Sequence, residues 1–506
     1  MVMRVTQQSL YGSVIRQNNA SLSALMATNL QSSTQKRINA PSDDPNGASV
    51  VLNTRTNMSE LTQYQRNIDS AEGWLKQSDS TLTSVSTLIT SIKAYAEQGA
   101  TGSVTDANRE EIGSAVRQYF EQLISLANTS YGDYALFSGQ MTDTAAFEQT
   151  LWMNSNDTAF DTQVEAGGGF TIQGDTEATI LVQFTGTDTV GHQPAFQYST
   201  DGGSTWTNGS YGTASAPANQ QMVMGGVTIE MADGALDAVT ACADEDDTEG
   251  TWMWIRPSAV YKGNSNDDIT VTGANTNVTG TATGDFSGNV MVRMDDTSGS
   301  PCIYSYSVDG GTTWVGNQTS GAVTATSITM AVPGGILEID PSTGALSDGD
   351  QFFIQPSTAD VAMTVSPTDS VVVNGVGKDI FGGIYNDEAV EIEGSVEGNL
   401  FETMGKLIGY LETNNQQGCQ EALDQIAASQ EHLLTVAASV GARENRVASA
   451  DTMVQNLYEN SNTTLSNVED ADLTALITTL AQQELAYQAV LKSSSTVMQL
   501  SLVNYI

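Results

Sequence analysis

The chain has 506 residues, which is too long for one ordinary domain, so we expect several domains. It carries 59 acidic and 18 basic residues, a formal net charge of -41, which argues against nucleic-acid binding and disfavours an anionic membrane surface. Such a composition suits a protein that stays soluble outside the cell, although a generally acidic proteome explains it equally well.

The first expected helix carries a weak seam, meaning a row of positions spaced alternately three and four residues apart. Its members are Tyr11, Ile15, Asn18, Leu22, Leu25 and Asn29. The two asparagines cost stability, so this helix should be marginal unless a partner covers it. The N-terminus has no apolar run typical of a cleaved signal peptide, and no stretch approaches a membrane span. We therefore expect any export to bypass the ordinary secretory route.

A loop with two prolines follows this helix. Its notable residues are Lys36, Arg37, Asn39, Pro41, Ser42, Asp43, Asp44 and Pro45. The prolines prevent helix continuation and bias the residues before them toward extended geometry. Ser42 or Asp43 is expected to cap the next helix, and Lys36 and Arg37 can pair with Asp43, Asp44 or carboxylates of a neighbouring subunit. The pattern predicts a capped turn between two helices.

The strongest periodic signal is a second seam. It consists of Leu61, Tyr64, Ile68, Ala71, Leu75, Ser78, Leu82, Val85, Ile89, Ile92 and Ala96. Five heptads at this spacing predict a helix of roughly 50 Å that ends at Gly99. A further helix should start at Thr105 or Asp106, and the segment YGDYALFSG, Tyr131 to Gly139, predicts a strand and a turn.

Between Gly167 and Pro356 the composition shifts to Gly, Thr, Ser and Asp with short Val, Ile, Tyr and Trp runs, which is typical of β-structure. Four blocks recur there in one order about 100 to 110 residues apart: TILVQF with NVMVRM, YSTDGGSTW with YSVDGGTTW, GGVTIEM with GGILEID, and WMWIRP with QFFIQP. This period is too long for a solenoid or a propeller blade. We therefore predict two copies of one small β domain.

Each copy contains the pattern S-x-D-x-G-x-T-W, which resembles the Asp-box of sialidases. In that motif the aspartate accepts amide hydrogens of a turn, the glycine permits the turn, and the tryptophan packs beneath it. We predict hairpin turns with core tryptophans at Asp201, Gly203, Trp206, Asp309, Gly311 and Trp314. Sialidase catalysis needs an arginine cluster, but this region holds only Arg256 and Arg293. Stacking of a glycan on a tryptophan is the alternative.

The cysteines, the acidic run and the catalytic motifs predict little chemistry. Cys242, Cys302 and Cys419 lack C-x-x-C spacing, so we expect buried free thiols, with a Cys242–Cys302 disulfide as the alternative. The acidic run from Asp244 to Glu249 lacks EF-hand spacing and predicts a solvated loop, with weak calcium binding as the alternative. No Walker loop, H-E-x-x-H or G-x-S-x-G pattern occurs. We predict no enzymatic activity, cofactor or metal site.

The C-terminal end is again helical, with one stretch from about Gln417 to Tyr458. The last helix carries what we call the C-terminal assembly seam: Leu473, Leu476, Leu480, Gln483, Tyr487, Val490, Ser494 and Val497. Ser466 to Glu469 matches a capping box, and Asp470 and Asp472 suit the positive end of that helix's dipole. Because both ends of the chain carry seams, we expect a hairpin path in which the seams bury each other.

The segment KRINAPSDDP, Lys36 to Pro45, closely resembles the loop between the first two helices of the flagellin superfamily. The ending VEDAD, Val468 to Asp472, and the seam after it resemble the C-terminal helix of that superfamily. YALFSGQMTDTAAF, Tyr134 to Phe147, is more similar to the hook–filament junction subfamily than to flagellin, and GVGKDIFGG, Gly375 to Gly383, resembles that subfamily's return strand. The resemblance covers about residues 1–147 and 375–506, and it excludes the β repeats.

The resemblance implies an α+β multidomain chain, in which both termini form a flagellin-like antiparallel helical bundle or coiled coil. Two tandem, sandwich-like all-β domains are inserted in it. The expected domains are a terminal coiled coil (1–45 with 460–506), a helical rod (46–150 with 385–459), a first β domain (151–264), and a second β domain with the return strand (265–384).

The resemblance also implies a function, which is to join the flagellar hook to the filament through polymerisation of the termini. The implied partners are the first hook-associated protein, flagellin, further copies in a ring and an export chaperone, with no nucleic acid or membrane. The implied location is outside the cell, after export by the flagellar type III apparatus. Terminal helices would stay loosely folded during export and order when neighbours bury the seams, and the loop between the first two helices would contact a neighbouring subunit. The alternatives are a flagellin, or a secreted Asp-box protein that binds or cleaves glycans.

Overall fold

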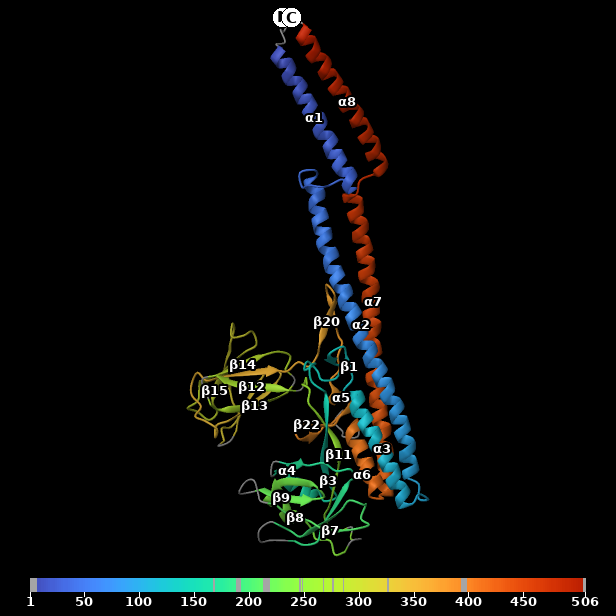
Figure 1. Cartoon of the computed structure of the whole chain (residues 1–506). Coiled ribbons are helices and arrows are strands. Elements are labelled where there is room, and N and C mark those ends of the chain that lie inside the picture. The colour runs from blue at the N-terminus through green and yellow to red at the C-terminus, as the bar shows by residue number, and fades with distance from the viewer. Residues whose placement is uncertain are drawn as a thin grey trace. The chain divides into compact units, whose positions relative to one another are not determined.

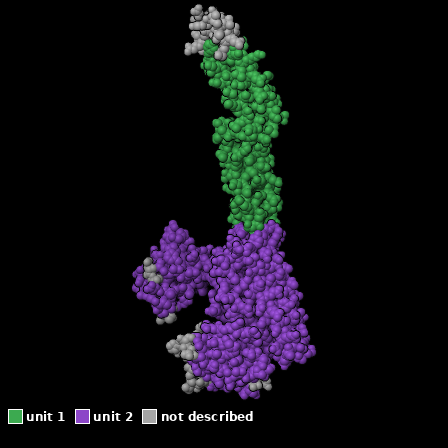
Figure 2. Space-filling view, in the orientation of Figure 1, with its two compact units in different colours: residues 1–70, 364–370, 446–506 green, residues 71–363, 371–445 purple. Residues whose placement is uncertain are grey.

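The computed structural model describes residues 7–166, 169–187, 193–212, 219–244, 247, 249–266, 268–274, 277–284, 286–324, 327–392 and 398–503. The chain divides into two compact units, which Figure 2 colours separately. Unit 1 comprises residues 1–70, 364–370 and 446–506, and unit 2 comprises residues 71–363 and 371–445. Unit 1 is mainly helical and unit 2 combines helices with several β-sheets, so the predicted α+β multidomain class is confirmed.

Helices dominate both ends of the described chain. They are α1 (Gln7–Thr34), α2 (Pro45–Gly99), α3 (Asp106–Ala127), α6 (Leu400–Glu412), α7 (Gln416–Glu469) and α8 (Leu473–Val503). The two long helices, α2 with 55 residues and α7 with 54, each contribute one part to each unit. Among the described residues, none of the helices combines the length and the apolar character that crossing a bilayer requires.

The predicted seam of α2 lies on the buried face of that helix, and α2 ends at Gly99 as predicted. Its buried members are Leu61, Ile68, Ala71, Leu75, Ser78, Leu82, Val85, Ile89, Ile92 and Ala96, while Tyr64 is half-buried. Regular three-and-four spacing therefore identified the packed side of this helix correctly.

In unit 1, α1 lies against α8, and Figure 1 shows the two helices side by side. The predicted seam of α1 is partly wrong, because Ile15 and Asn29 are exposed, whereas Val14 is half-buried and Thr28 is buried. The contact face therefore begins with a step of three from Tyr11, not four. Adjacent helical positions differ by about 100° in direction, so an error of one residue moves a side chain off the seam.

The start of α8 also differs from the prediction. Oδ1 of Asp472 accepts hydrogen bonds from the backbone N–H groups of Thr474 (2.9 Å) and Ala475 (3.2 Å), so Asp472 caps the helix at its positive end. The predicted capping box is wrong, because Ser466 to Glu469 form the last turn of α7. Ser466 Oγ donates to the Asp470 carboxylate at 2.6 Å, just beyond that turn.

The first β region of unit 2 is built from two sheets that share one core. The larger sheet contains β3 (Phe147–Ser155), β5 (Ile180–Phe184), β6 (Phe196–Ser199), β7 (Thr207–Asn208), β11 (Trp252–Tyr261), β22 (Ile384–Tyr385) and β23 (Glu388–Ala389). The smaller sheet contains β4 (Phe170–Gln173), β8 (Ser210–Tyr211), β9 (Asn219–Met224) and β10 (Val227–Ala232). Helix α4 (Thr158–Ala166) and the 3-10 turn η1 (Asp233–Ala238) add residues to this core, in which Phe160, Phe184 and Ile229 are fully buried.

The second β region has the same organisation. Its larger sheet contains β12 (Ile269–Ala274), β14 (Val290–Asp296), β15 (Ile303–Ser307), β16 (Val315–Thr319) and β19 (Gln351–Pro356). Its smaller sheet contains β13 (Thr279–Gly284), β17 (Ile328–Val332) and β18 (Gly335–Asp340). A separate core that includes Tyr304, Ile339 and Phe352 fills this region.

The two regions share strand order and register. The order β11-β5-β6-β7 matches β19-β14-β15-β16, and β4-β10-β9 matches β13-β18-β17. Met253 pairs with Val182 in the first region, and Phe352 pairs with Val292 at the corresponding place in the second. Strand β3 pairs with β11 in the same way that β12 pairs with β19.

Short elements connect these parts. They are the hairpins β1 (Ser130–Tyr131) with β2 (Tyr134–Ala135) and β20 (Ala362–Ser366) with β21 (Asp369–Val372), and the helix α5 (Gly377–Phe381). The strand and turn predicted after α3 are the first of these hairpins. The return strand predicted for Gly375–Gly383 is wrong, because α5 occupies most of it and only Val376 forms a β-bridge, to Ser138.

Candidate functional site

The loop between α1 and α2 is tied to the joint between α7 and α8. Lys36 Nζ lies 2.5 Å from a carboxylate oxygen of Glu469, which also pairs with Arg55 and is only 5% exposed. Arg37 Nη2 donates to the carbonyl oxygen of Val468 at 2.8 Å. The scarce positive charges of this loop therefore pair with a carboxylate and donate to a carbonyl of the same chain, and these contacts hold the turn on α7.

Two aspartates shape the loop itself. The Asp43 carboxylate accepts hydrogen bonds from the backbone N–H groups of Asn39 (2.9 Å) and Ala40 (2.8 Å). Asp44 Oδ1 accepts from the N–H of Gly47 at 2.9 Å, and Asp44 also pairs with Arg37 at 3.3 Å. The N-cap of α2 is therefore Asp44, and the predicted cap at Ser42 or Asp43 is wrong. Pro45 at the first helical position explains this, since its fixed φ starts the helix there.

The tip of this loop faces solvent. Pro41, Ser42 and Asp43 are exposed, and Pro45 is exposed as well, while Asn39 is half-buried. Ile38 lies beneath the tip and packs with Ala48, Val51, Leu465 and Val468. The loop thus holds its exposed tip, Pro41 to Asp43, above the small apolar cluster around Ile38.

The face of α8 that meets α1 contains most of the C-terminal assembly seam. Leu476 is 7% exposed, and Leu480, Tyr487 and Val490 are half-buried. Leu473 does not follow the prediction and is exposed, because it lies at the first position of the helix. The side chain of Val497 lies outside the described residues.

Outside the face that α1 and α8 share, both helices carry apolar residues that the described part of the chain leaves exposed. Ile477 is 61% exposed and Leu485 is 69% exposed on α8, and Leu491 is exposed too. Met26 and Leu30 are exposed on α1. We call Met26, Leu30, Ile477, Leu485 and Leu491 the uncovered apolar set, and they define a candidate assembly surface on unit 1.

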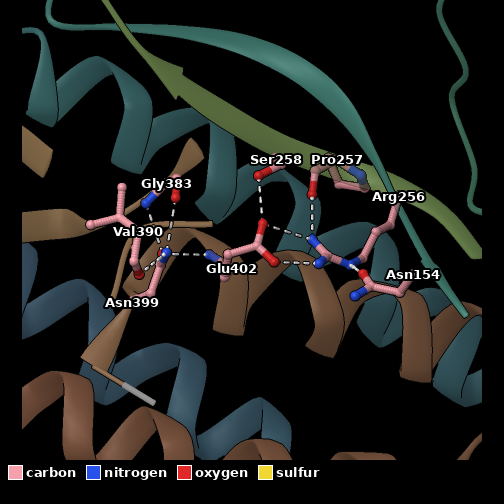
Figure 3. A network of polar contacts seen from close by, with 8 residues as sticks. All are labelled: Asn154, Arg256, Pro257, Ser258, Gly383, Val390, Asn399 and Glu402. Carbon is pink, nitrogen blue, oxygen red and sulfur yellow. Dashed lines mark hydrogen bonds and ion pairs between the residues drawn. The ribbon is translucent and has the colours of Figure 1, made fainter. Parts of the chain in front are cut away.

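A buried polar network joins the first β region to α6 within unit 2 (Figure 3). Arg256 on β11 is 1% exposed, and its Nη2 lies 2.5 Å from Glu402 Oε2 on α6. Ser258 Oγ donates to the same carboxylate at 2.8 Å, and Arg256 Nε donates to Asn154 Oδ1 at 2.5 Å. Burial raises the pKa of Glu402, but Arg256 and Ser258 together hold that pKa below its usual value.

Further contacts support this network. Asn399 caps α6 by accepting from the N–H of Glu402 at 3.0 Å, and its amide donates to the carbonyls of Gly383 (2.9 Å) and Val390 (3.0 Å). Helix α6 can approach β11 because a Cβ on Gly405 would lie only 2.3 Å from the carbonyl oxygen of Pro257. At the other end of α6, Glu412 accepts from Arg117 and from the N–H of Thr179.

The two Asp-box segments form the same turn. Asp201 Oδ1 accepts from Ser199 Oγ (2.7 Å) and from the N–H of Thr205 (2.8 Å). In the second segment Asp309 Oδ1 accepts from Ser307 Oγ (2.8 Å) and from the N–H of Thr313 (2.8 Å). Two glycines follow the aspartate in each turn, and all four have positive φ, between 68° and 94°.

The tryptophans of these segments are not core residues, contrary to the prediction, because both are half-buried. The Trp206 ring packs edge to face on Trp252, with 5.8 Å between ring centroids. Arg293 lies 4.6 Å from the centroid of the Trp314 ring. Each tryptophan sits at the rim of its sheet, where a turn can cover only one side of the ring.

The turn at Asp309 predicts a pH dependence. Hydrogen bonds from Thr313 and Ser307 lower the pKa of Asp309 to about 2 from an ordinary value of 3.8. A carboxyl with a depressed folded-state pKa contributes stability above about pH 3.8, and this contribution is lost as the pH falls toward 2. We expect the Asp309 carboxyl carbon to titrate near pH 2 in an NMR titration, and Asp309→Asn to remove this contribution. Titration near pH 4 would contradict the turn geometry.

The remaining predicted features carry little chemistry. Cys242, Cys302 and Cys419 are free and buried, and burial raises the pKa of each thiol. Among the described residues, no group of three or more His, Cys, Asp or Glu side chains could hold a metal ion. In the acidic run, the Asp247 carboxylate accepts from the N–H groups of Ala243 (2.7 Å) and Glu249 (2.9 Å), while residues 245, 246 and 248 lie outside the described part.

Comparison with known proteins supports the resemblance. Residues 5–142 match the family described as the bacterial flagellin N-terminal helical region, so the predicted similarity to the flagellin superfamily is confirmed. Among the relatives, proteins named Flagellar hook-associated protein 3 from Escherichia coli (29% identical) and Salmonella typhimurium (28% identical) match 148 residues, 29% of this chain and 47% of theirs. The chain thus spans about half the length of these curated relatives.

Two further matches extend over most of the chain. A flagellin from Salmonella rubislaw is 22% identical over 498 residues, which covers 94% of both chains. The crystal structure of flagellar hook associated protein-3 from Legionella pneumophila is 14% identical, covers 82% of this chain and 98% of that one, and has a TM-score of 0.32.

Proposed function

We propose that this chain is a structural protein of the bacterial flagellum that joins the hook to the filament. The observation that carries the proposal is the combination of two features. The N-terminal part is similar to proteins named flagellar hook-associated protein 3, and the terminal helices carry an apolar set that the chain does not cover. This combination describes a subunit whose helices are completed by neighbours.

The proposed mechanism is polymerisation through unit 1. Copies of the chain arrange in a ring, and the uncovered apolar set of each copy is buried by its neighbours. The first hook-associated protein lies on one side of the ring and flagellin on the other. A marginal α1 stays loosely folded during export, with an export chaperone as a partner, and orders on assembly. The exposed tip at Pro41 to Asp43 contacts an adjacent subunit.

We also propose the domain division 1–45 with 460–506, 46–150 with 385–459, 151–264 and 265–384, in which the last two are copies of one β domain. Support for the duplication comes from the shared strand order, the shared register and the identical hydrogen bonds of the two Asp-box turns. These domains lie outside residues 5–142, the part that matches the family, and we infer that they act as an insert that spaces the junction or projects from it.

A deletion strain tests the proposed function. We expect cells that lack this protein to build hooks and to release flagellin into the medium without attached filaments, and we expect the intact gene to restore filaments. A flagellin has a different phenotype, because its loss leaves hooks with their junction but no released subunits. Normal filaments in the deletion strain would overturn the proposal. Electron microscopy of the cells and immunoblots of the medium measure both outcomes.

A further inference from the structure

A cavity lies inside unit 2 between the larger sheet of the first β region and helices α6 and α7. Its volume is about 700 Å³, within the usual 300 to 1,000 Å³ of ligand sites. The residues that matter for its chemistry are Asn154, Trp254, Arg256, Lys406, Tyr410 and Glu421. A second hollow of about 300 Å³ shares Trp254 and Asn415 with it and continues to Leu181 and Trp252. The half-buried indole of Trp254 therefore borders both hollows.

Lys406 supplies a positive charge that the described part of the chain does not pair. This residue is half-buried on α6, and within the described residues it makes no ion pair with a carboxylate. The carboxylate that interacts with the charge of Lys406 is that of Glu402, and this carboxylate already binds Arg256 and Ser258. Burial lowers the pKa of Lys406, Glu402 raises it, and Arg256 lowers it further, so its overall direction is downward. An anion beside the ammonium group would relieve this cost.

Two other groups of the cavity, the Tyr410 hydroxyl and the Asn154 amide nitrogen, are donors without a partner among the described residues. The hydroxyl of Tyr410 makes no hydrogen bond with the described residues, and burial raises its pKa, so it stays protonated. Asn154 uses its oxygen for Arg256, and its amide nitrogen is not used in the network of Figure 3. The first turn of α7, capped by Asn415, lines the same cavity with Gln417 and Gly418, and the positive end of the helix dipole lies there.

The charge balance limits the ligand to a single negative charge. The guanidinium of Arg256 is committed to Glu402, Asn154 and a carbonyl, so Lys406 is the one cation left to bind an anion among the lining residues. Glu421 lines the same cavity and repels a doubly charged phosphate, but its carboxylate can accept hydrogen bonds from neutral hydroxyl groups. A ligand with one carboxylate and several hydroxyl groups pairs with Lys406 through the carboxylate and donates hydrogen bonds to Glu421 through the hydroxyls.

We propose that this cavity binds an acidic saccharide, a hexuronate unit within a short glycan. The sugar carboxylate lies on Lys406 and Tyr410, its hydroxyls bond to the amides and Glu421, and an apolar face of the ring stacks on Trp254. The second hollow beyond Trp254 gives room for a further sugar unit. This site is separate from the Asp-box turns, and the proposal does not depend on the role of the chain in the flagellum.

The test uses the purified full chain with three probes: cellobiouronate (glucuronosyl-glucose, which has one carboxylate), the neutral disaccharide cellobiose, and sodium sulfate. Isothermal titration and tryptophan fluorescence follow binding at low salt. We expect cellobiouronate to bind at least about tenfold more tightly than cellobiose, because only the acidic sugar pairs with Lys406. Sulfate should bind at least about tenfold more weakly than cellobiouronate, because it cannot stack on Trp254. Binding of cellobiose or sulfate as tight as that of cellobiouronate, or no binding of cellobiouronate, would overturn the proposal.

Matched variants locate the binding. Lys406→Met should weaken cellobiouronate binding about tenfold or more, whereas Lys406→Arg should retain it within a few-fold. Tyr410→Phe should cost a smaller factor and leave cellobiose unaffected. Lys262→Met is the control, because Lys262 is an exposed lysine paired with Glu148 and lies away from the lining residues. Circular dichroism checks that each variant is folded, and unchanged affinity in folded Lys406→Met would overturn the assignment.

Discussion

Replacing Arg256 with methionine is expected to lower the free energy of unfolding by about 3 to 5 kcal/mol, the usual effect of removing one partner from a buried ion pair. Glu402 would then keep a buried carboxylate with Ser258 as its remaining partner. The effect is large because Arg256 and Glu402 are 1% and 3% exposed, so water cannot replace the lost guanidinium. The first β region and α6 should separate most easily in this variant.

Amide hydrogen exchange of β11 and α6 measures this loss locally, which matters because a chain of several domains need not unfold in one step. The double variant Arg256→Met, Glu402→Leu should recover most of the lost protection, since it also removes the carboxylate that Arg256→Met leaves without its guanidinium. Lys262→Met breaks the exposed pair with Glu148 and should change stability by no more than about 1 kcal/mol. A loss in Arg256→Met as small as that of Lys262→Met would contradict the role given to the pair.

The same network has a predictable response to acid. The folded-state pKa of Glu402 is held below its ordinary value of 4.5, so the contribution of the pair is present above pH 4.5. It is lost as the pH falls through the folded-state pKa and the carboxyl takes up a proton.

The long helices were predictable because a packed helix face places apolar residues at regular intervals along the sequence. The seam of α2 repeats over five heptads, so an error at one position does not change which face of the helix is predicted to be buried. In α1 the same reasoning misplaced Ile15, because only a few apolar residues define that seam and two adjacent positions, Val14 and Ile15, both fit it. The structure places the larger side chain outside, where a partner and not the chain itself would cover it.

The buried network could not be predicted from sequence patterns. Arg256 and Glu402 are 146 positions apart, and nothing in the spacing of charges identifies them as a pair. Helix α6 was also missed, since it is 13 residues long and contains Gly405 and Gly409, which weaken a helical signal. Gly405 lets α6 approach Arg256, because a Cβ there would lie 2.5 Å from Arg256 Nη1, so a glycine that weakened the helical signal also permits the contact. The available signal was that a long acidic β region contains only two arginines, Arg256 and Arg293.

Replacing Ile477 with aspartate is expected to block assembly while leaving the isolated chain intact. Ile477 is 61% exposed on α8, so a carboxylate there remains solvated in the monomer. In the polymer a neighbour would cover this position, and burial of an isoleucine is worth about 1.5 to 3 kcal/mol. Its loss, added to the cost of burying a charge, should raise the concentration needed for polymerisation at least about tenfold.

Two variants give this prediction its controls. Leu476→Asp alters the neighbouring residue, which is 7% exposed and faces α1, so it should loosen α1 and α8 in the monomer as well as stop assembly. Val308→Asp makes the same kind of change at an exposed apolar residue of the second β region, and it should polymerise normally. Sedimentation measures polymer in vitro, attached filaments measure it in cells, and amide exchange measures the monomer. If Ile477→Asp assembled as well as Val308→Asp, the uncovered apolar set would not be the assembly surface, because a buried contact cannot accept an unpaired carboxylate without loss.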